Sequence, residues 1–133
     1  KSEVKMIGKD VTIVSFGKIF KEAVKAVEEL KKQDIQAELI DLRTIRPLDM
    51  NPILESVKKT NRLVILEESW PFGNISSEIS YQVQNRIFDY LDAPIEKINT
   101  ADTPAPYSPV LLADWIPNYN DVIKSAKKVL YKS

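Results

Sequence analysis

The chain has 133 residues, no cysteine and no histidine, and its 19 basic residues balance its 19 acidic ones. This length suits one domain with a substantial core, and zero net charge gives no global field that favours nucleic acid or an anionic membrane. The missing residue types exclude disulfides, thiolate nucleophiles and histidine bases within these residues. Three widely spaced glycines exclude a glycine-rich phosphate loop. Catalysis by this chain alone is therefore not expected.

The first elements along the chain predict two strands joined by a helix. Residues 10–16 are apolar and β-branched, which predicts a buried strand, and residues 37–42 predict the next one. Residues 3–7 are interpreted as an additional edge strand. The apolar stripe between the two buried strands has helical spacing and consists of Phe20, Ala23, Val24, Val27 and Leu30.

A short helix and a third strand follow. Asp49 or Asn51 is expected to cap the helix, because both side chains accept hydrogen bonds from a first turn, and Pro52 is tolerated there. Residues 62–68 then form an apolar run that predicts the third strand. The buried side of the short helix is predicted to consist of Ile53, Leu54 and Val57.

The last third of the chain predicts two more helices around a fourth strand. Residues 95–101 predict the strand, and Asn118 or Asn120 is expected to cap the final helix. The helix before Pro94 is indicated by apolar residues at every fourth position, namely Ile75, Ile79, Val83 and Ile87. The apolar face of the final helix is predicted to be Val122, Ile123, Ala126, Val129 and Leu130.

Strands that alternate with helices pair in parallel, because each connecting helix must pack back over the sheet. The order of elements therefore predicts a three-layer α/β/α domain that occupies residues 1–133. The first residue is lysine instead of methionine, so we interpret the chain as a piece of a longer polypeptide.

Polar residues at the predicted strand ends allow two interpretations each. Glu67 and Glu68 stand beside Ser69 and Trp70, and a carboxylate against an indole could act in acid–base chemistry. Adjacent strand residues face opposite sides, so an ion pair for one glutamate and solvent for the other is the alternative. Gly17 before a helix could assist anion binding or simply form a turn.

Aromatic residues in proline-containing loops are also ambiguous. Trp70, Trp115 and Tyr107 lie in such segments. Large aromatic side chains are enriched in protein interfaces, but they also close the ends of small cores. Both interpretations remain open at this point.

Four segments resemble a known family in their order and spacing. They are DVTIVSFGKIFKEAVKAVEEL, DLRTIRPLD, KKTNRLVILEESWPFGNISSEIS and YLDAPIEKINTADTPAPYSP. Together they are similar to the carboxyl-terminal domain of the beta subunits of pyruvate dehydrogenase's decarboxylating component, in the transketolase C-terminal-domain family. The resemblance implies a five-stranded, mostly parallel sheet with one antiparallel edge strand.

The resemblance also implies how the work of the parent enzyme is divided. In this family thiamine diphosphate and magnesium lie between the alpha subunit and the amino-terminal domain of the beta subunit, outside this chain. The carboxyl-terminal domain is non-catalytic and provides contacts to the alpha subunit and to a second beta subunit. Residues expected to hold packed loops together or to contact a subunit are Arg43, Arg46, Asp49 and Trp70, since arginine suits bonding to carbonyls and carboxylates.

A docking surface for the dihydrolipoyl acyltransferase is the second role that the resemblance implies. Its basic subunit-binding domain is expected to meet Asp92, with Asp89 nearby and Ser133 at the carboxyl end. The alternative for Asp92 is that it only shapes the turn before Pro94. An abundance of isoleucine and lysine over alanine favours a bacterial, cytoplasmic protein, with the mitochondrial matrix as the alternative.

Three rival functions remain open from sequence. One is the same domain of a branched-chain 2-oxoacid or acetoin dehydrogenase. Another is a free-standing α/β module that binds a small ligand at the strand ends. The third is a parent of the transketolase or deoxyxylulose-phosphate-synthase type, which would use a phosphosugar.

Overall fold

The structure is a computed structural model that describes residues 1–43, 48–67, 75–98 and 118–133. Its five strands form one sheet in the order β1-β3-β2-β4-β5. The edge strand β1 runs antiparallel to β3, and the other neighbours pair in parallel. The sheet predicted from sequence is confirmed. The strands are β1 (Glu3–Met6), β2 (Val11–Ser15), β3 (Ala37–Asp41), β4 (Leu63–Leu66) and β5 (Glu96–Ile98).

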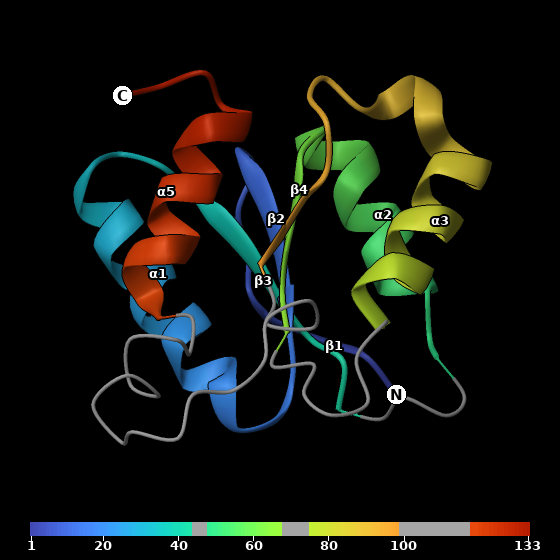
Figure 1. The fold of residues 1–133 in the computed structure, drawn as a ribbon, viewed down its shortest axis with the longest axis horizontal. Helices are drawn as coiled ribbons and strands as arrows, with labels where there is room; N and C mark the ends of the chain where they lie inside the picture. The colour runs from blue at the N-terminus through green and yellow to red at the C-terminus, as the bar shows by residue number, and fades with distance from the viewer. Residues whose placement is uncertain (44–47, 68–74, 99–117) are drawn as a thin grey trace, which may run out of the picture.

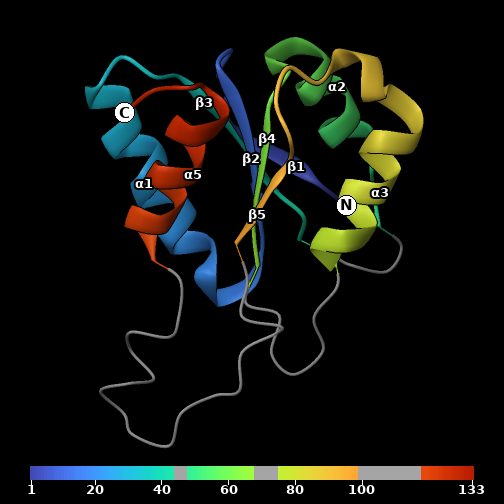
Figure 2. The same ribbon diagram turned by 45° about the horizontal axis from the view of Figure 1, so that its top comes forward.

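Helices cover both faces of the sheet, which confirms the predicted three layers (Figures 1 and 2). One face carries α1 (Phe20–Lys32) and α5 (Tyr119–Val129), and the other carries α2 (Asn51–Thr60) and α3 (Ile75–Ile87). Two 3₁₀ turns, η1 (Gly17–Ile19) and η2 (Phe88–Tyr90), follow β2 and α3. None of the helices in these described ranges has the length and apolarity to cross a bilayer.

Two hydrophobic clusters pack against opposite faces of the sheet because successive strand residues point to opposite sides. In β2, Val11 and Ile13 face α1 and α5, whereas Val14 faces α2 and α3. The predicted apolar stripes are confirmed, with buried members on all four helices. Those members include Ala23, Val27, Leu30, Ile53, Leu54, Val57, Ile79, Val83, Ile87, Val122, Ala126 and Val129.

The helix caps agree with the sequence prediction at one helix and differ at another. Asn118 caps α5, and its side chain and that of Asp121 form a reciprocal capping box. The prediction of Asp49 or Asn51 as the cap of α2 was wrong. The N-cap is Met50, which makes no side-chain cap bond. Asp49 instead accepts hydrogen bonds from Ser2, 47 residues away in sequence.

Glycine occupies positions 8 and 17 for two different structural reasons. A Cβ on Gly8 would lie 2.3 Å from the carbonyl carbon of Ala37, so the close approach of β1's end to β3 requires glycine. Gly17 has φ +72° and open space around it. This favours the interpretation of Gly17 as a turn residue.

Candidate functional site

The carboxyl ends of the parallel strands are the first place to look for a site, because ligands of open α/β sheets bind there. The described residues at this edge include Ser15, Asp41 and Glu67, which end or follow β2, β3 and β4. Ser15 is fully buried, and its hydroxyl has no hydrogen-bond partner among the described residues. Glu68, Ser69 and Trp70 lie outside the described residues.

Glu67 is a buried carboxylate that caps a helix. It is 1% exposed, and it accepts hydrogen bonds from the backbone amide and the hydroxyl of Ser76 at 3.0 and 3.2 Å. Ser76 lies in the first turn of α3, where free amides and the helix dipole favour an anion. The burial and these bonds favour a structural role for Glu67 over acid–base chemistry.

The loop after β3 is tied to the amino-terminal segment by two of the predicted residues. Arg43 has φ 61°, its amide donates to Asp41, and its guanidinium lies 3.3 Å from the carboxylate of Glu3. The Ser2 hydroxyl donates to the carbonyl oxygen of Asp49 at 2.8 Å, and the Ser2 amide donates to the Asp49 carboxylate at 3.3 Å. Arg43 and Asp49 therefore connect this loop to residues 2–3. Arg46, another predicted contact residue, lies outside the described residues.

The predicted docking residue Asp92 lies at the opposite edge, where β4 and β5 begin, and Figure 1 shows the carboxyl end of the chain at this edge. The Asp92 amide donates to the carbonyl oxygen of Asn61 at 2.9 Å, and the Asp92 carbonyl oxygen accepts from the Tyr131 hydroxyl at 3.3 Å. These bonds bring Asp92 and the carboxyl-terminal segment together. The carboxylate of Asp92 lies 4.0 Å from Arg62, and its side chain is 56% exposed.

Asp89 and Ser133 are also accessible to a partner. Both are exposed, and Asp89 lies in η2 between Phe88 and Tyr90, two exposed aromatic residues. The structure therefore offers acidic groups, aromatic surface and the chain's carboxyl end at one edge. Sequence reasoning selected the acidic residues but did not include the flanking aromatic ones.

A buried polar network that sequence reasoning missed joins β2, β3 and α2. Glu38 forms an ion pair with Lys59 and accepts from the Gly8 amide at 3.1 Å. Burial raises the pKa of Glu38, but the hydrogen bonds from Lys59, Ser56 and Gly8 outweigh burial and hold that pKa below its ordinary value. The Thr12 hydroxyl continues the network, with both Ser56 and Thr60 at 2.7 Å.

This network lies at the amino ends of β2 and β3, away from the edge where ligands of such sheets bind. A signal for it was present in the sequence: a glutamate within a buried strand requires a partner. Its bonds connect three elements, so the arrangement is structural.

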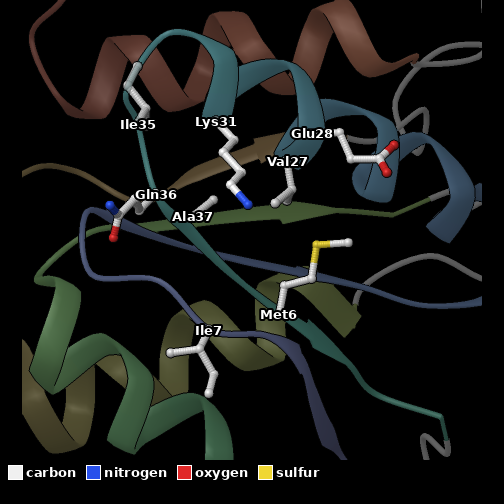
Figure 3. Close-up of a pocket in the computed structure, with 8 residues that line it drawn as sticks. All are labelled: Met6, Ile7, Val27, Glu28, Lys31, Ile35, Gln36 and Ala37. Carbon is white, nitrogen blue, oxygen red and sulfur yellow. The ribbon is translucent and has the colours of Figure 1, made fainter.

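A groove of about 580 Å³ lies between α1 and the β1 edge of the sheet. Figure 3 shows Met6 and Lys31 extending into this space from opposite sides. Ile7, at the end of β1, is 85% exposed. The remaining lining residues are Val27, Glu28, Ile35, Gln36 and Ala37. Its volume suits a small ligand. Its lining is mostly apolar, with the charged residues Glu28 and Lys31 on the side of α1.

Comparison with known proteins explains this arrangement of elements. Residues 1–122 match the family described as transketolase, C-terminal domain. The chain belongs to this family. The resemblance inferred from the sequence is therefore confirmed.

Two similar curated proteins are subunits of one enzyme component. The chain is 47% identical over 132 residues to the pyruvate dehydrogenase E1 component subunit beta of Rhizobium meliloti, covering 99% of this chain and 29% of that protein. It is 45% identical over 133 residues to the mitochondrial subunit beta-1 of Oryza sativa, covering 100% of this chain and 36% of that protein. The chain thus spans about a third of the length of these relatives.

Solved structures support the same fold. A split-gene transketolase, described as an inactive beta4 tetramer, superimposes with a TM-score of 0.85 at 26% identity, covering 98% of this chain and 42% of that one. A 2-oxoglutarate:ferredoxin oxidoreductase from Magnetococcus marinus superimposes with a TM-score of 0.64 at 10% identity, covering 98% of this chain and 20% of that one. This second likeness concerns the fold alone.

Proposed function

We propose that this chain is the non-catalytic assembly and docking domain of the beta subunit of the pyruvate dehydrogenase decarboxylating component. The observation that carries the proposal is the 47% identity to a subunit of that name over 99% of the chain. The parent enzyme decarboxylates pyruvate and transfers the acetyl group to the lipoyl group of the acyltransferase.

Thiamine diphosphate and magnesium belong to the parent enzyme in this proposal. Among the described residues, no three acidic, histidine or cysteine side chains come together as metal ligands would. The proposal assigns the cofactor to other parts of the enzyme. The role of this chain is to hold subunits together.

Its partners are the alpha subunit, a second beta subunit and the subunit-binding domain of the acyltransferase. The juxtaposition of Asp92 with the carboxyl-terminal segment, through the Tyr131 hydroxyl, supports one docking surface that includes Asp89 and Ser133. Arg43, Arg46, Asp49 and Trp70 remain the proposed loop and subunit contacts. Similar subunits come from bacteria and from mitochondria, and we propose the bacterial cytoplasm, with the mitochondrial matrix as the alternative.

The test uses the full-length polypeptide that contains this chain, purified together with its alpha subunit. With an artificial electron acceptor, pyruvate should be decarboxylated faster than a branched-chain 2-oxoacid, acetoin or a phosphosugar. Preference for any of the latter three would contradict the proposal. A complete enzyme should also form a stable complex with the acyltransferase core on a sizing column.

The groove beside β1 favours a second candidate, a module that binds a small ligand. Its volume of about 580 Å³ and its lysine and glutamate rim suit a small amphipathic acid. A ligand that binds the native state raises the melting temperature by mass action. A panel of small acids and nucleotides that leaves the melting temperature unchanged would eliminate this candidate.

A further inference from the structure

The groove between α1 and β1 has an apolar lining that belongs to the packed core of the domain. Val27 of α1 and Ala37 of β3 line it and are buried, and Met6 of β1 lines it and is half-buried. The first two belong to the hydrophobic cluster beneath α1, and Met6 packs against that cluster. A ligand in the groove would therefore lie against a surface that is already formed, as is usual for small-molecule sites.

The groove also has a large apolar side chain that is open to solvent. Ile7 lines the groove and is 85% exposed, the highest value among the large apolar side chains that the structure describes. A single exposed apolar residue is common, but Ile7 directly follows Met6 at the same groove. An apolar chain bound there would remove this surface from water, which is favourable.

Lys31 supplies a positive charge beside the apolar lining. Its side chain leaves the last turn of α1 and extends into the groove, opposite Met6 (Figure 3). Within the described ranges, its ammonium group has no ion-pair partner. Because this group has three hydrogen-bond donors, it can bind a carboxylate placed in the groove.

Glu28, the other charged residue of the lining, does not neutralise Lys31. Its carboxylate points away from the Lys31 ammonium group in Figure 3. Its charge acts on Lys32, whose pKa is raised mainly by the hydrogen bond and charge of Glu29, with a smaller contribution from Glu28. A ligand in the groove therefore meets the cation of Lys31, and a second anionic group on that ligand would approach Glu28.

We propose that the groove binds a small monocarboxylate, with its carboxylate on Lys31 and its apolar chain along Val27, Ala37 and Met6. One cation beside an apolar surface complements one anion at the end of an apolar chain. The volume of about 580 Å³ lies within the range of small-molecule sites. The proposal names the ligand class of the second candidate function. It is compatible with the assembly role, because no residue of the groove is among the proposed docking or loop contacts.

The binding test uses the two methionines of the 133 residues as reporters. Met6 lines the groove, whereas Met50 is buried in the cluster on the opposite face of the sheet. The full-length polypeptide is labelled with ¹³C-methyl methionine, purified with its alpha subunit and titrated with butanoate, hexanoate and octanoate. The Met6 methyl signal, assigned by its loss in Met6→Leu, should shift saturably. The Met50 signal, assigned in the same way with Met50→Leu, should stay in place.

The length of the ligand tests the apolar part of the site. The affinity should rise about fourfold for each methylene group added to the chain, because each one is removed from water. Suberate, which has a carboxylate at both ends of an eight-carbon chain, should bind more weakly than octanoate, since its second charge would lie on apolar lining or near Glu28.

Substitutions of Lys31 test the position of the carboxylate. Octanamide has the same chain without the charge, and the wild type should bind it about fivefold more weakly than octanoate, as expected for an exposed ion pair. Lys31→Gln should bind both alike, and Lys31→Glu should prefer octylammonium to octanoate. Lys31 is exposed, so these changes leave the core intact. Lys21→Gln, at an exposed position of the same helix outside the groove lining, is the matched control and should keep the wild-type preference.

Several results would overturn the proposal. These are an affinity that does not rise with chain length, equal binding of octanoate and octanamide by the wild type, and a preference for octanoate that survives in Lys31→Gln. A Met6 signal that does not respond in the assembled enzyme would show that the groove is closed or covered by another part of the enzyme, and it would also overturn the proposal.

Pyruvate decarboxylation by the same preparations separates the ligand site from the proposed assembly role. Activity on pyruvate without a Met6 shift rejects only the ligand site. A saturable Met6 shift without activity on pyruvate retains the ligand site and rejects the assignment to the pyruvate enzyme.

Discussion

The carboxylate of Glu67 accepts two hydrogen bonds from Ser76, one from its amide at 3.0 Å and one from its hydroxyl at 3.2 Å. Glu67 directly follows β4, and Ser76 lies in the first turn of α3. The pair therefore fixes where α3 begins relative to the sheet. An anion at the positive end of a helix dipole adds to this stabilisation.

We predict that Glu67→Ala lowers the free energy of unfolding by about 2–3 kcal/mol, because a buried amide loses its charged acceptor. Ser76→Ala, which keeps the amide, should cost about 1 kcal/mol. Urea denaturation measures both changes. Glu55→Ala is the control: Glu55 is exposed and 3.5 Å from Lys58, and its loss should stay within about 0.5 kcal/mol. A Glu67→Ala value within that range would contradict the prediction.

A second prediction concerns the stability of the domain in acid. The folded-state pKa of Glu38 lies below its ordinary value of 4.5, so the unfolded chain binds this proton more readily. The stabilisation is fully present above about pH 4.5 and is lost as pH falls through the lower folded-state pKa. Urea midpoints measured from pH 6 downward should fall more steeply for the wild type than for Glu38→Gln. Glu55→Gln should retain the wild-type slope, and a parallel curve for Glu38→Gln would refute the prediction.

A third prediction tests the close approach at Gly8. Gly8→Ala should destabilise the domain by about 1–3 kcal/mol, as overpacking does, because the new Cβ would lie 2.3 Å from a backbone carbon. Thermal unfolding followed by circular dichroism gives the change. At Gly17 the surroundings are open and φ is positive, so Gly17→Asn should be nearly neutral, since asparagine tolerates this conformation. Equal effects at the two positions would contradict the steric argument.

A fourth prediction concerns docking. Asp92→Asn in the full-length subunit should weaken binding of the acyltransferase's subunit-binding domain at least tenfold, about 1.4 kcal/mol. A carboxylate that faces a basic partner loses a charge-assisted hydrogen bond. Decarboxylation by the free enzyme should be unchanged, and added salt should weaken the wild-type complex. Surface-plasmon titration measures the affinity.

The matched control for docking is Asp34→Asn, at an exposed position with φ 64° that asparagine also adopts. This control should leave binding unchanged. An unaltered affinity for Asp92→Asn would leave Asp92 with the role of shaping the turn, through its backbone bonds to Asn61 and Tyr131.

Local patterns predicted the elements well because their information is local. The apolar run of β2 and the stripes on α1, α3 and α5 follow from which side chains must be buried. Asn118 was predicted as one of two possible caps because its bonds reach only to Asn120 and Asp121. Such features depend on neighbours in sequence, and they need no knowledge of the fold.

Features that depend on distant partners could not be predicted in this way. Asp49 was expected to cap α2, but its carboxylate and its carbonyl oxygen accept hydrogen bonds from Ser2 instead. The Glu38 network required knowing that Lys59 and Ser56 face β3.

During synthesis of the chain, the residues of one hydrophobic cluster are complete earlier than those of the other. The members of the cluster beneath α2 and α3 that the structure describes all precede residue 96, whereas the cluster beneath α1 lacks Val122, Ala126 and Val129 until α5 has been made. A nascent chain without α5 exposes the part of this apolar side that α5 covers, over β4 and β5, while α1 still covers β2 and β3. Exposed apolar surface of this kind promotes aggregation of folding intermediates. Helix α5 therefore protects the nascent chain, and a premature stop codon before α5 would release an aggregation-prone product.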